Sequence, residues 1–408
     1  MRTFYGWRVV GAAFVLAAFG WGIGFYGPPV FLRVICETRG WALATVSGAV
    51  TAHFLVGAVV GANLPRLHRW LGAARATKAA ALSLALGVIG WAAAVAPWQL
   101  FVASLLSGAG WSAMSAAAVN AIVSPWFVRR RPAALAMAYN GGSIGGVIFS
   151  PLWVAAIGAL GFPAAAAAIG AAVALTMWIL ADLLLSCTPA QMGLAPDGDA
   201  PQGLHSCTSH ASSAPASPLT GLQLWGDWKF LTLAAGMALG LFAQIGLMAH
   251  LFSLLAPVLG AQHAGLALGL ATALAIGGRT LTGWLMPVAA DRRLAACASY
   301  AVQLAGSLVF AAAAGTSVPL LLLGIALFGA GFGNSTSLPP LIAQAEFGQD
   351  DVPRVVALIV AIAQAAYAFA PAAFATLRAA DALTAAPLFA CAAGVQGLAI
   401  MALLAGRR

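Results

Sequence analysis

Arg279 is the residue of this sequence whose surroundings point most directly to binding chemistry. It stands inside a long apolar run, between Gly278 and Thr280. An arginine deep in a membrane helix costs at least about 2.5–3.5 kcal/mol, so such residues usually face a cavity or a partner. A planar guanidinium can hold a carboxylate through two parallel hydrogen bonds. We therefore expect Arg279 to bind an anionic substrate. The competing interpretation is that it snorkels to the cytoplasm or holds a backbone carbonyl.

Three further ionisable residues are candidates for coupling transport to protons. His53 lies near the middle of another apolar run, and an unperturbed imidazole titrates near pH 6.5. A neutral histidine bonded to a neighbouring helix is the competing interpretation. Asp182 and Glu346 lie near the ends of apolar runs, where pairing with basic loop residues competes with a proton role.

Uncharged polar and aromatic residues inside the apolar runs are the remaining candidates. Each polar group must find a hydrogen-bond partner where water is absent, and a water-lined cavity supplies one. Contacts between helices, worth ~0.6 kcal/mol each, are the alternative. The polar residues expected within the bundle are Asn120, Tyr139, Asn140, Gln244, Asn334, Gln364 and Tyr367. With Arg279, the predicted substrate-binding set is Trp21, Tyr26, Asn120, Tyr139, Asn140, Asn334, Gln364 and Tyr367, and Trp111 is a further aromatic candidate for the cavity wall.

The elements that position these residues must lie in a membrane. The chain has 408 residues, of which 62% are hydrophobic and 7% charged. Soluble domains carry roughly 25% charged residues, so the composition excludes a soluble enzyme, a disordered chain and a secreted disulfide scaffold. The five cysteines are scattered, and no face of the chain interleaves basic and aromatic residues. We expect no cofactor, no metal and no nucleic-acid partner.

Apolar runs bounded by charge, proline or glycine predict an all-α membrane protein with twelve transmembrane helices. A span needs about 20 residues, and the first run is too long and too bulky at its end for a cleaved signal peptide. The predicted helices are 7–35, 42–65, 76–95, 98–126, 131–158 and 163–186 in the first half, and 228–257, 262–286, 293–313, 318–346, 351–378 and 383–404 in the second.

The basic residues in the connections predict the orientation. Fifteen lysines and arginines fall on one side of the predicted membrane, and only Arg33, Arg39 and Arg378 fall on the other. Because cytoplasmic loops carry the excess of basic residues, both termini are expected in the cytoplasm. We expect an integral protein of a bacterial-type inner (plasma) membrane, surrounded by lipid and monomeric.

The chain divides into two related halves. Residues 187–226 are polar and rich in Pro, Ser and Gly, which predicts a cytoplasmic linker between six-helix bundles at 1–186 and 227–408. A shift of 221 residues places Trp7 on Trp228, Pro132 on Pro353, and the Gly-Ala-Gly at 108–110 on that at 329–331. Such repeats occur in transporters that bind substrate near the midplane, between the halves.

Several segments are similar to a known family. Residues 125–131 read Pro-Trp-Phe-Val-Arg-Arg-Arg, and Leu-Ala at 135–136, spaced glycines and Pro151 follow. Further similar segments are the Tyr-Gly-Trp at 5–7, the linker at 192–199, and the run 278–285 with Asp-Arg-Arg at 291–293. Together these segments resemble the major facilitator superfamily, and within it the monocarboxylate and oxalate–formate transporter branch. The resemblance implies two pseudo-symmetric six-helix bundles that work by alternating access.

The sequence also departs from that family. Residues 61–66 lack the aspartate that superfamily members usually place in the helix 2–3 loop, and the stretch around Phe25 replaces a helix 1 lysine. Ala275 stands where monocarboxylate members place an aspartate, and Gln364 where oxalate exchangers place a second basic residue. A dianion clamp and proton coupling through an Asp–Arg pair are therefore not expected.

The sequence thus predicts a secondary active transporter for a small, monocarboxylate-like organic anion, with proton coupling left open. An exporter of amphiphilic or toxic compounds is the first alternative, because one arginine and many aromatic residues would also serve it. An intramembrane enzyme is the less favoured alternative from a different class, since no metal-spaced His-rich motif, pair of catalytic carboxylates or Ser/His/Asp set at membrane depth supports it.

Overall fold

The computed structural model describes residues 4–198, 221–287, 290–313, 316–380 and 385–407. Every regular element in these ranges is a helix. The N-terminal half contains α1 (Tyr5–Gly24), α2 (Gly27–Arg39), α3 (Leu43–Ala93), α4 (Pro97–Ser112), α5 (Ala116–Val123), the 3-10 helix η1 (Ser124–Trp126), α6 (Arg131–Leu160) and α7 (Phe162–Leu184). The described parts of the connection to the second half hold η2 (Ala190–Met192), η3 (Pro196–Gly198) and α8 (Gly221–Gly226).

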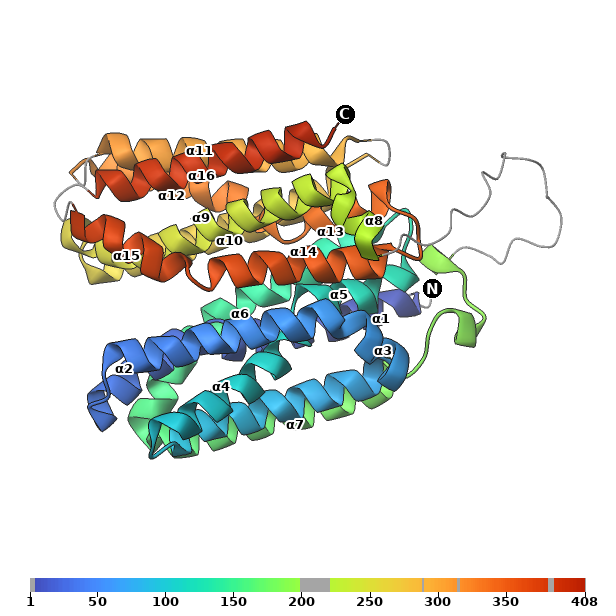
Figure 1. The fold of residues 1–408 in the computed structure, drawn as a ribbon, viewed down its shortest axis with the longest axis horizontal. Coiled ribbons are helices and arrows are strands. Elements are labelled where there is room, and N and C mark those ends of the chain that lie inside the picture. The colour runs from blue at the N-terminus through green and yellow to red at the C-terminus, as the bar shows by residue number, and fades with distance from the viewer. Residues whose placement is uncertain (1–3, 199–220, 288–289, 314–315, 381–384, 408) are drawn as a thin grey trace.

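The C-terminal half repeats this order of spans. Its helices are α9 (Trp228–Leu259), α10 (Ala261–Leu285), α11 (Arg292–Ala313), α12 (Val318–Phe332), η4 (Gly333–Ser335), α13 (Leu338–Glu346), α14 (Val352–Tyr367), α15 (Ala370–Ala380) and α16 (Ala386–Ala405). Figure 1 shows the two halves as adjacent groups of long, roughly aligned helices, with the N and C marks at the same end.

The all-helical membrane fold predicted from the apolar runs is confirmed. Eleven helical stretches among the described residues are long and apolar enough to cross a membrane. One of them, α3, supplies two crossings because it bends at Gly72, whose backbone is not helical at φ 75° and ψ 163°. The remaining ten supply one crossing each, which gives the twelve expected.

The expected end of the second helix at residue 65 is wrong. Helix α3 continues through Pro65 and reverses direction only at Gly72. A proline favours the end of a helix because it lacks an N–H and crowds the preceding turn. Inside a membrane protein, neighbouring helices and side chains can satisfy the backbone groups that a proline frees. Gly72 makes the bend because a positive φ carries little penalty for glycine.

Close helix contacts recur at matching places in the two halves. Gly108 of α4 lies against the backbone of His53 on α3, and a Cβ at Gly108 would collide with that carbonyl. Gly329 of α12, 221 positions later, lies in the same way against Ala271 of α10. Small residues let helix backbones approach where lipid gives no hydrophobic drive for association. The repeat in the sequence therefore reflects a repeated packing contact.

Candidate functional site

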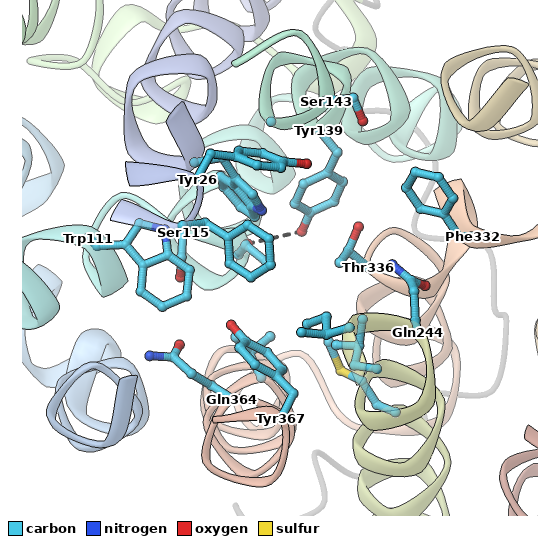
Figure 2. A pocket seen from close by; sticks show the side chains of 18 of the residues that line it. Tyr26, Trp111, Ser115, Tyr139, Ser143, Gln244, Phe332, Thr336, Gln364 and Tyr367 are labelled. Atoms are coloured by element: carbon cyan, nitrogen blue, oxygen red, sulfur yellow. Dashed lines mark hydrogen bonds between the residues drawn. The ribbon is translucent and has the colours of Figure 1, made fainter. Parts of the chain in front are cut away.

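A cavity of about 90 Å³ lies between the two halves, at the level where four spans lose helical form. The breaks fall between α1 and α2, between α4 and α5, between η4 and α13, and between α14 and α15. A polar side chain in or directly beside each break lies on the cavity wall, namely Tyr26, Ser115, Thr336 and, at the end of α14, Tyr367. Figure 2 shows these residues around the cavity. Discontinuous helices are tolerated at membrane depth where they line such a cavity.

Arg279 of α10 lines this cavity and joins both halves. Its Nε donates to the carbonyl of Gly333 at 2.5 Å, where α12 gives way to η4. Its Nη1 donates to Asn140 Oδ1 at 3.0 Å and to Ser143 Oγ at 3.3 Å, both on α6 of the other half. The third nitrogen, Nη2, has no hydrogen-bond partner among the described residues. One face of the guanidinium fork is therefore left for another acceptor.

No carboxylate of a described residue neutralises the charge of Arg279. The side chain is 5% exposed, and it is the one charged residue among the described residues that line the cavity. Its hydrogen-bond acceptors are a carbonyl, an amide and a hydroxyl, all of them neutral. A buried charge is costly unless it is paired, and charges interact strongly where the dielectric constant is low. The cavity is thus electrostatically suited to a negatively charged molecule.

Aromatic rings form much of the remaining wall. Phe25 and Tyr367 come from different halves, and their ring centroids lie 6.2 Å apart. Tyr367 also contacts Phe54 of α3, at 5.8 Å. The hydroxyl of Tyr139 donates to the carbonyl of Ala116 at 3.0 Å, so this ring is fixed in the wall. The other aromatic residues of the lining are Trp21, Tyr26, Trp111 and Phe332.

The predicted substrate-binding residues fall into two groups. Those that line the cavity are Arg279, Trp21, Tyr26, Tyr139, Gln364 and Tyr367, and Trp111 joins them. Asn140 is not part of the lining, but it accepts from Arg279 and donates to Thr280 Oγ1 at 2.8 Å, so it helps to hold the guanidinium. Asn334 lies away from the cavity and donates to Thr282 and Ser299, at 3.1 Å each.

Asn120 lies in a contact between the halves at the end that carries the termini. Gln344 of α13 donates to Asn120 Oδ1 at 2.9 Å and to Ser124 Oγ at 3.1 Å. Arg131 donates to Gln344 Oε1 at 3.3 Å. The rings of Trp7 and Trp284, one from each half, stack with their centroids 6.1 Å apart. These contacts hold the two halves together between the cavity and the end of the molecule that carries the termini.

His53 is fully buried within the N-terminal half and is not part of the cavity lining. Its Nε2 lies 2.9 Å from the carbonyl of Gly24, and its Nδ1 lies 2.8 Å from Ser107 Oγ. Because a carbonyl can only accept, the assignment that satisfies both contacts puts the proton on Nε2 and lets Ser107 donate to Nδ1. His53 thereby ties the end of α1, next to its break, to α4.

Asp182 and Glu346 each form an ion pair outside the cavity. Lys78 Nζ lies 2.5 Å from Asp182 Oδ1, and this carboxylate is exposed. Glu346 accepts from Arg293 Nε at 2.6 Å and from Arg293 Nη2 at 2.8 Å. Arg293 is buried and also donates to two carbonyls and to Thr232, so this pair joins helix ends in the C-terminal half. Neither carboxylate lines the cavity.

Sequence reasoning left several lining residues out of the candidate set. The substrate-binding set that the sequence predicts lacks Gln244, which is expected inside the bundle, and it also lacks Ser115, Ser143, Phe332 and Thr336. Ser143 could have been found, because it lies three positions after Asn140 and such residues share a helix face. Ser115 and Thr336 could not, because the helix breaks that expose them depend on tertiary contacts.

The described residues contain no group of three or more His, Cys, Asp or Glu side chains that could hold a metal ion. The lining offers no set of charged or coordinating groups besides Arg279. The arrangement is suited to reversible binding of a small molecule rather than to covalent chemistry.

Comparison with known proteins places these features in context. The model of the Major Facilitator Superfamily matches residues 78–371. Among similar solved structures are the human organic anion transporter MFSD10 (TETRAN), with 16% identity, a TM-score of 0.70 and coverage of 98% of this chain and 99% of that one. A variant of the E. coli fucose:proton symporter FucP has 14% identity, a TM-score of 0.67 and coverage of 97% and 98%. The proton:xylose symporter XylE, bound to 6-bromo-6-deoxy-D-glucose, has 12% identity, a TM-score of 0.73 and coverage of 98% and 95%. The comparison with curated proteins found no match.

Proposed function

The chain belongs to the Major Facilitator Superfamily and is a membrane transporter rather than an enzyme, and from this premise we propose that it carries a small organic anion by alternating access. The observation that carries the proposal is the free Nη2 of Arg279 on the wall of a cavity between the halves. A carboxylate there would receive a charge-assisted hydrogen bond from a guanidinium whose other nitrogens are already fixed.

The monocarboxylate branch is the finer assignment that we propose. The segment at 125–131, the helix-1 entry at 5–7 and the run around Arg279 support it, and so does the small volume of the cavity. Because the guanidinium has one free nitrogen and no second cation lines the described wall, a single carboxylate suits the site better than a dianion. One of the similar solved structures is an organic anion transporter, which is compatible with this assignment.

The contacts between the halves suggest how the site would open. Gln344 bonds to Asn120 and Ser124 at the end of the molecule that carries both termini. The excess of basic residues in the connections at this end supports a cytoplasmic location there, in a bacterial-type inner membrane. We propose that these contacts break when the cavity opens to the cytoplasm and that they close it in the present conformation.

Proton coupling through a carboxylate in the cavity is not proposed, because no Asp or Glu lines the described wall. Two of the similar structures are proton symporters, so coupling by another route stays part of the proposal. His53, the candidate that the sequence offers within the bundle, has partners at both ring nitrogens, so we do not propose it as the coupling residue.

An exporter of amphiphilic compounds is the second candidate function. The aromatic rings of Trp21, Phe25 and Trp111 in the cavity wall favour it. The cavity of about 90 Å³ and its unneutralised guanidinium favour a small anion instead. An exporter of this kind would accept larger, uncharged or cationic molecules, which the proposed transporter would reject.

Flux measurements in proteoliposomes would test the proposal. The purified protein would be offered radiolabelled acetate, butyrate, lactate, pyruvate and benzoate on one side, with ethidium as a cationic amphiphile. We expect saturable flux of at least one acid, no flux of ethidium, and loss of acid flux in Arg279→Gln. Arg33→Gln is the matched control, because Arg33 is exposed and, among the described residues, pairs only with Glu37, four residues away. Flux of ethidium without flux of any acid would favour the exporter.

A further inference from the structure

Gln244 is a buried amide that has no hydrogen-bond partner among the described residues. It lies on α9, is 8% exposed and lines the cavity. Its Oε1 atom is buried without a hydrogen bond, and its side chain makes none with any described residue. A primary amide can donate two hydrogen bonds and accept two, and leaving it unpaired in a low-dielectric interior is costly. A bound molecule could therefore form hydrogen bonds with this amide.

The other buried glutamines among the described residues show what an amide does when it joins helices. Gln303 donates to Ser335 Oγ at 3.0 Å, and Gln364 donates to the carbonyl of Phe54 at 2.8 Å. Gln396 accepts from Ser307 at 2.9 Å. Each of these side chains links two helices, whereas Gln244 links none. Gln303 Oε1 and Gln396 Nε2 also lack a partner, but each of these amides makes one bond between helices through its other polar atom, whereas Gln244 makes none with the described residues.

Thr336 is a further unused polar group in the same half of the cavity wall. It lies in the break between η4 and α13, lines the cavity, and its hydroxyl bonds to no described residue. In Figure 2, Gln244 and Thr336 project toward the cavity from the side away from Trp111. Both side chains can donate and accept hydrogen bonds, unlike the guanidinium of Arg279, which can only donate.

We propose that the substrate carries a hydroxyl group besides its carboxylate and that Gln244, assisted by Thr336, selects for it. This inference rests on the proposed transport of an organic anion. The carboxylate would meet Nη2 of Arg279, and the hydroxyl, which donates and accepts, would satisfy the amide. An acid without the hydroxyl would leave the amide unpaired, and sites built to bond a hydroxyl reject analogues that lack it.

Equilibrium binding to the purified wild-type protein would test the inference, with butyrate and its 2-, 3- and 4-hydroxy derivatives as probes in titration calorimetry. We expect at least one hydroxy acid to bind about tenfold more tightly than butyrate, which is about 1.4 kcal/mol. Gln244→Met retains an unbranched side chain of similar volume without the amide. This substitution should weaken the binding of the hydroxy acid and leave the binding of butyrate unchanged. The ratio of the two dissociation constants should then be close to one.

The outcomes separate this inference from the proposed function. Binding of butyrate and the hydroxy acids with equal affinity, or a preference that persists in Gln244→Met, would overturn the role of Gln244 while leaving anion binding intact. Failure of all four acids to bind the wild-type protein would overturn the inference together with the proposed carriage of small carboxylates.

Thermal unfolding of the ligand-free protein gives a second, independent readout. Gln244→Met should raise the melting temperature, because it removes an amide that has no partner. Gln303→Met is the matched control and should lower it, because it removes the bond to Ser335. If both substitutions lower the melting temperature equally, Gln244 has a partner within the protein and the inference fails.

Discussion

Arg279 and His53 are both basic side chains buried in membrane-spanning helices, one in each half of the molecule. Both ring nitrogens of His53 are engaged by Gly24 and Ser107, and the residue lies away from the cavity. Arg279 has two of its three nitrogens engaged, and it lines the cavity with the third free. A buried ionisable residue is thus no proof of a binding site. The difference lies in whether the protein itself satisfies every polar atom.

The largest effect is expected at Arg279. Arg279→Lys keeps the charge but cannot reach Gly333, Asn140 and a ligand together with one ammonium group. We expect flux of the acids to fall roughly 100-fold, about 2.8 kcal/mol, within the range for truncating a buried charge pair. Flux per folded protein in proteoliposomes measures this. Retention of wild-type flux by Arg279→Lys would mean that the fork geometry has no part in binding.

His53→Gln should instead destabilise the protein and leave its transport intact. One amide cannot reproduce both contacts, so Gly24 or Ser107 loses a buried partner, at about 1–3 kcal/mol. The melting temperature should fall, and flux per folded protein and its pH profile should match the wild type. A shifted pH profile in protein that is folded would restore His53 as a proton-coupling residue and remove the contrast with Arg279.

Two glycine substitutions sharpen the comparison, because each disturbs the backbone beside one of the two residues. A Cβ at Gly333 would collide with the carbonyl of Ala275, and Gly333 supplies the carbonyl that holds Arg279 Nε. A Cβ at Gly108 would collide with the carbonyl of His53. Both alanine variants should lose about 1–3 kcal/mol of stability through overpacking. Only Gly333→Ala should also weaken acid binding, measured by titration calorimetry, and equal weakening by both would contradict this.

The smallest effect is expected at an exposed ion pair. Asp182 pairs with Lys78 at 2.5 Å, and 57% of its side chain is exposed. Exposed pairs contribute roughly 0–1 kcal/mol, so Asp182→Asn should change the melting temperature little. Its flux and pH profile should equal those of the wild type. A lost dependence of flux on pH in this variant would instead assign proton coupling to Asp182.

The sequence was sufficient for the fold because membrane spans depend on local composition. Runs of about 20 apolar residues and their basic flanks located the C-terminal ends of eleven of the twelve predicted helices to within four residues. The exception is the second predicted helix, because Pro65 does not end α3. The repeat at 221 residues was visible because the same small residues are needed for the same close contacts, as at Gly108 and Gly329.

The site was predictable only in part, for a physical reason. Arg279 was identified by the cost of burying a charge, which the sequence reveals directly. The same principle of polar burial predicts Asn120 and Asn140 as substrate-binding residues. In the structure, however, Asn120 bonds to Gln344, and Asn140 bonds to Arg279. Which polar atoms remain unpaired, as at Gln244, depends on contacts between distant segments that composition does not encode.

The most direct test of the central claim compares one acid with its neutral amide. The tightest-binding acid of the flux panel and its primary amide would be titrated into purified wild-type protein and into Arg279→Gln. If the guanidinium binds a negative charge, the wild-type protein should bind the acid about 100-fold more tightly than the amide, and the variant should bind both alike. Equal binding of acid and amide to the wild-type protein, or a preference that survives in Arg279→Gln, would contradict the account.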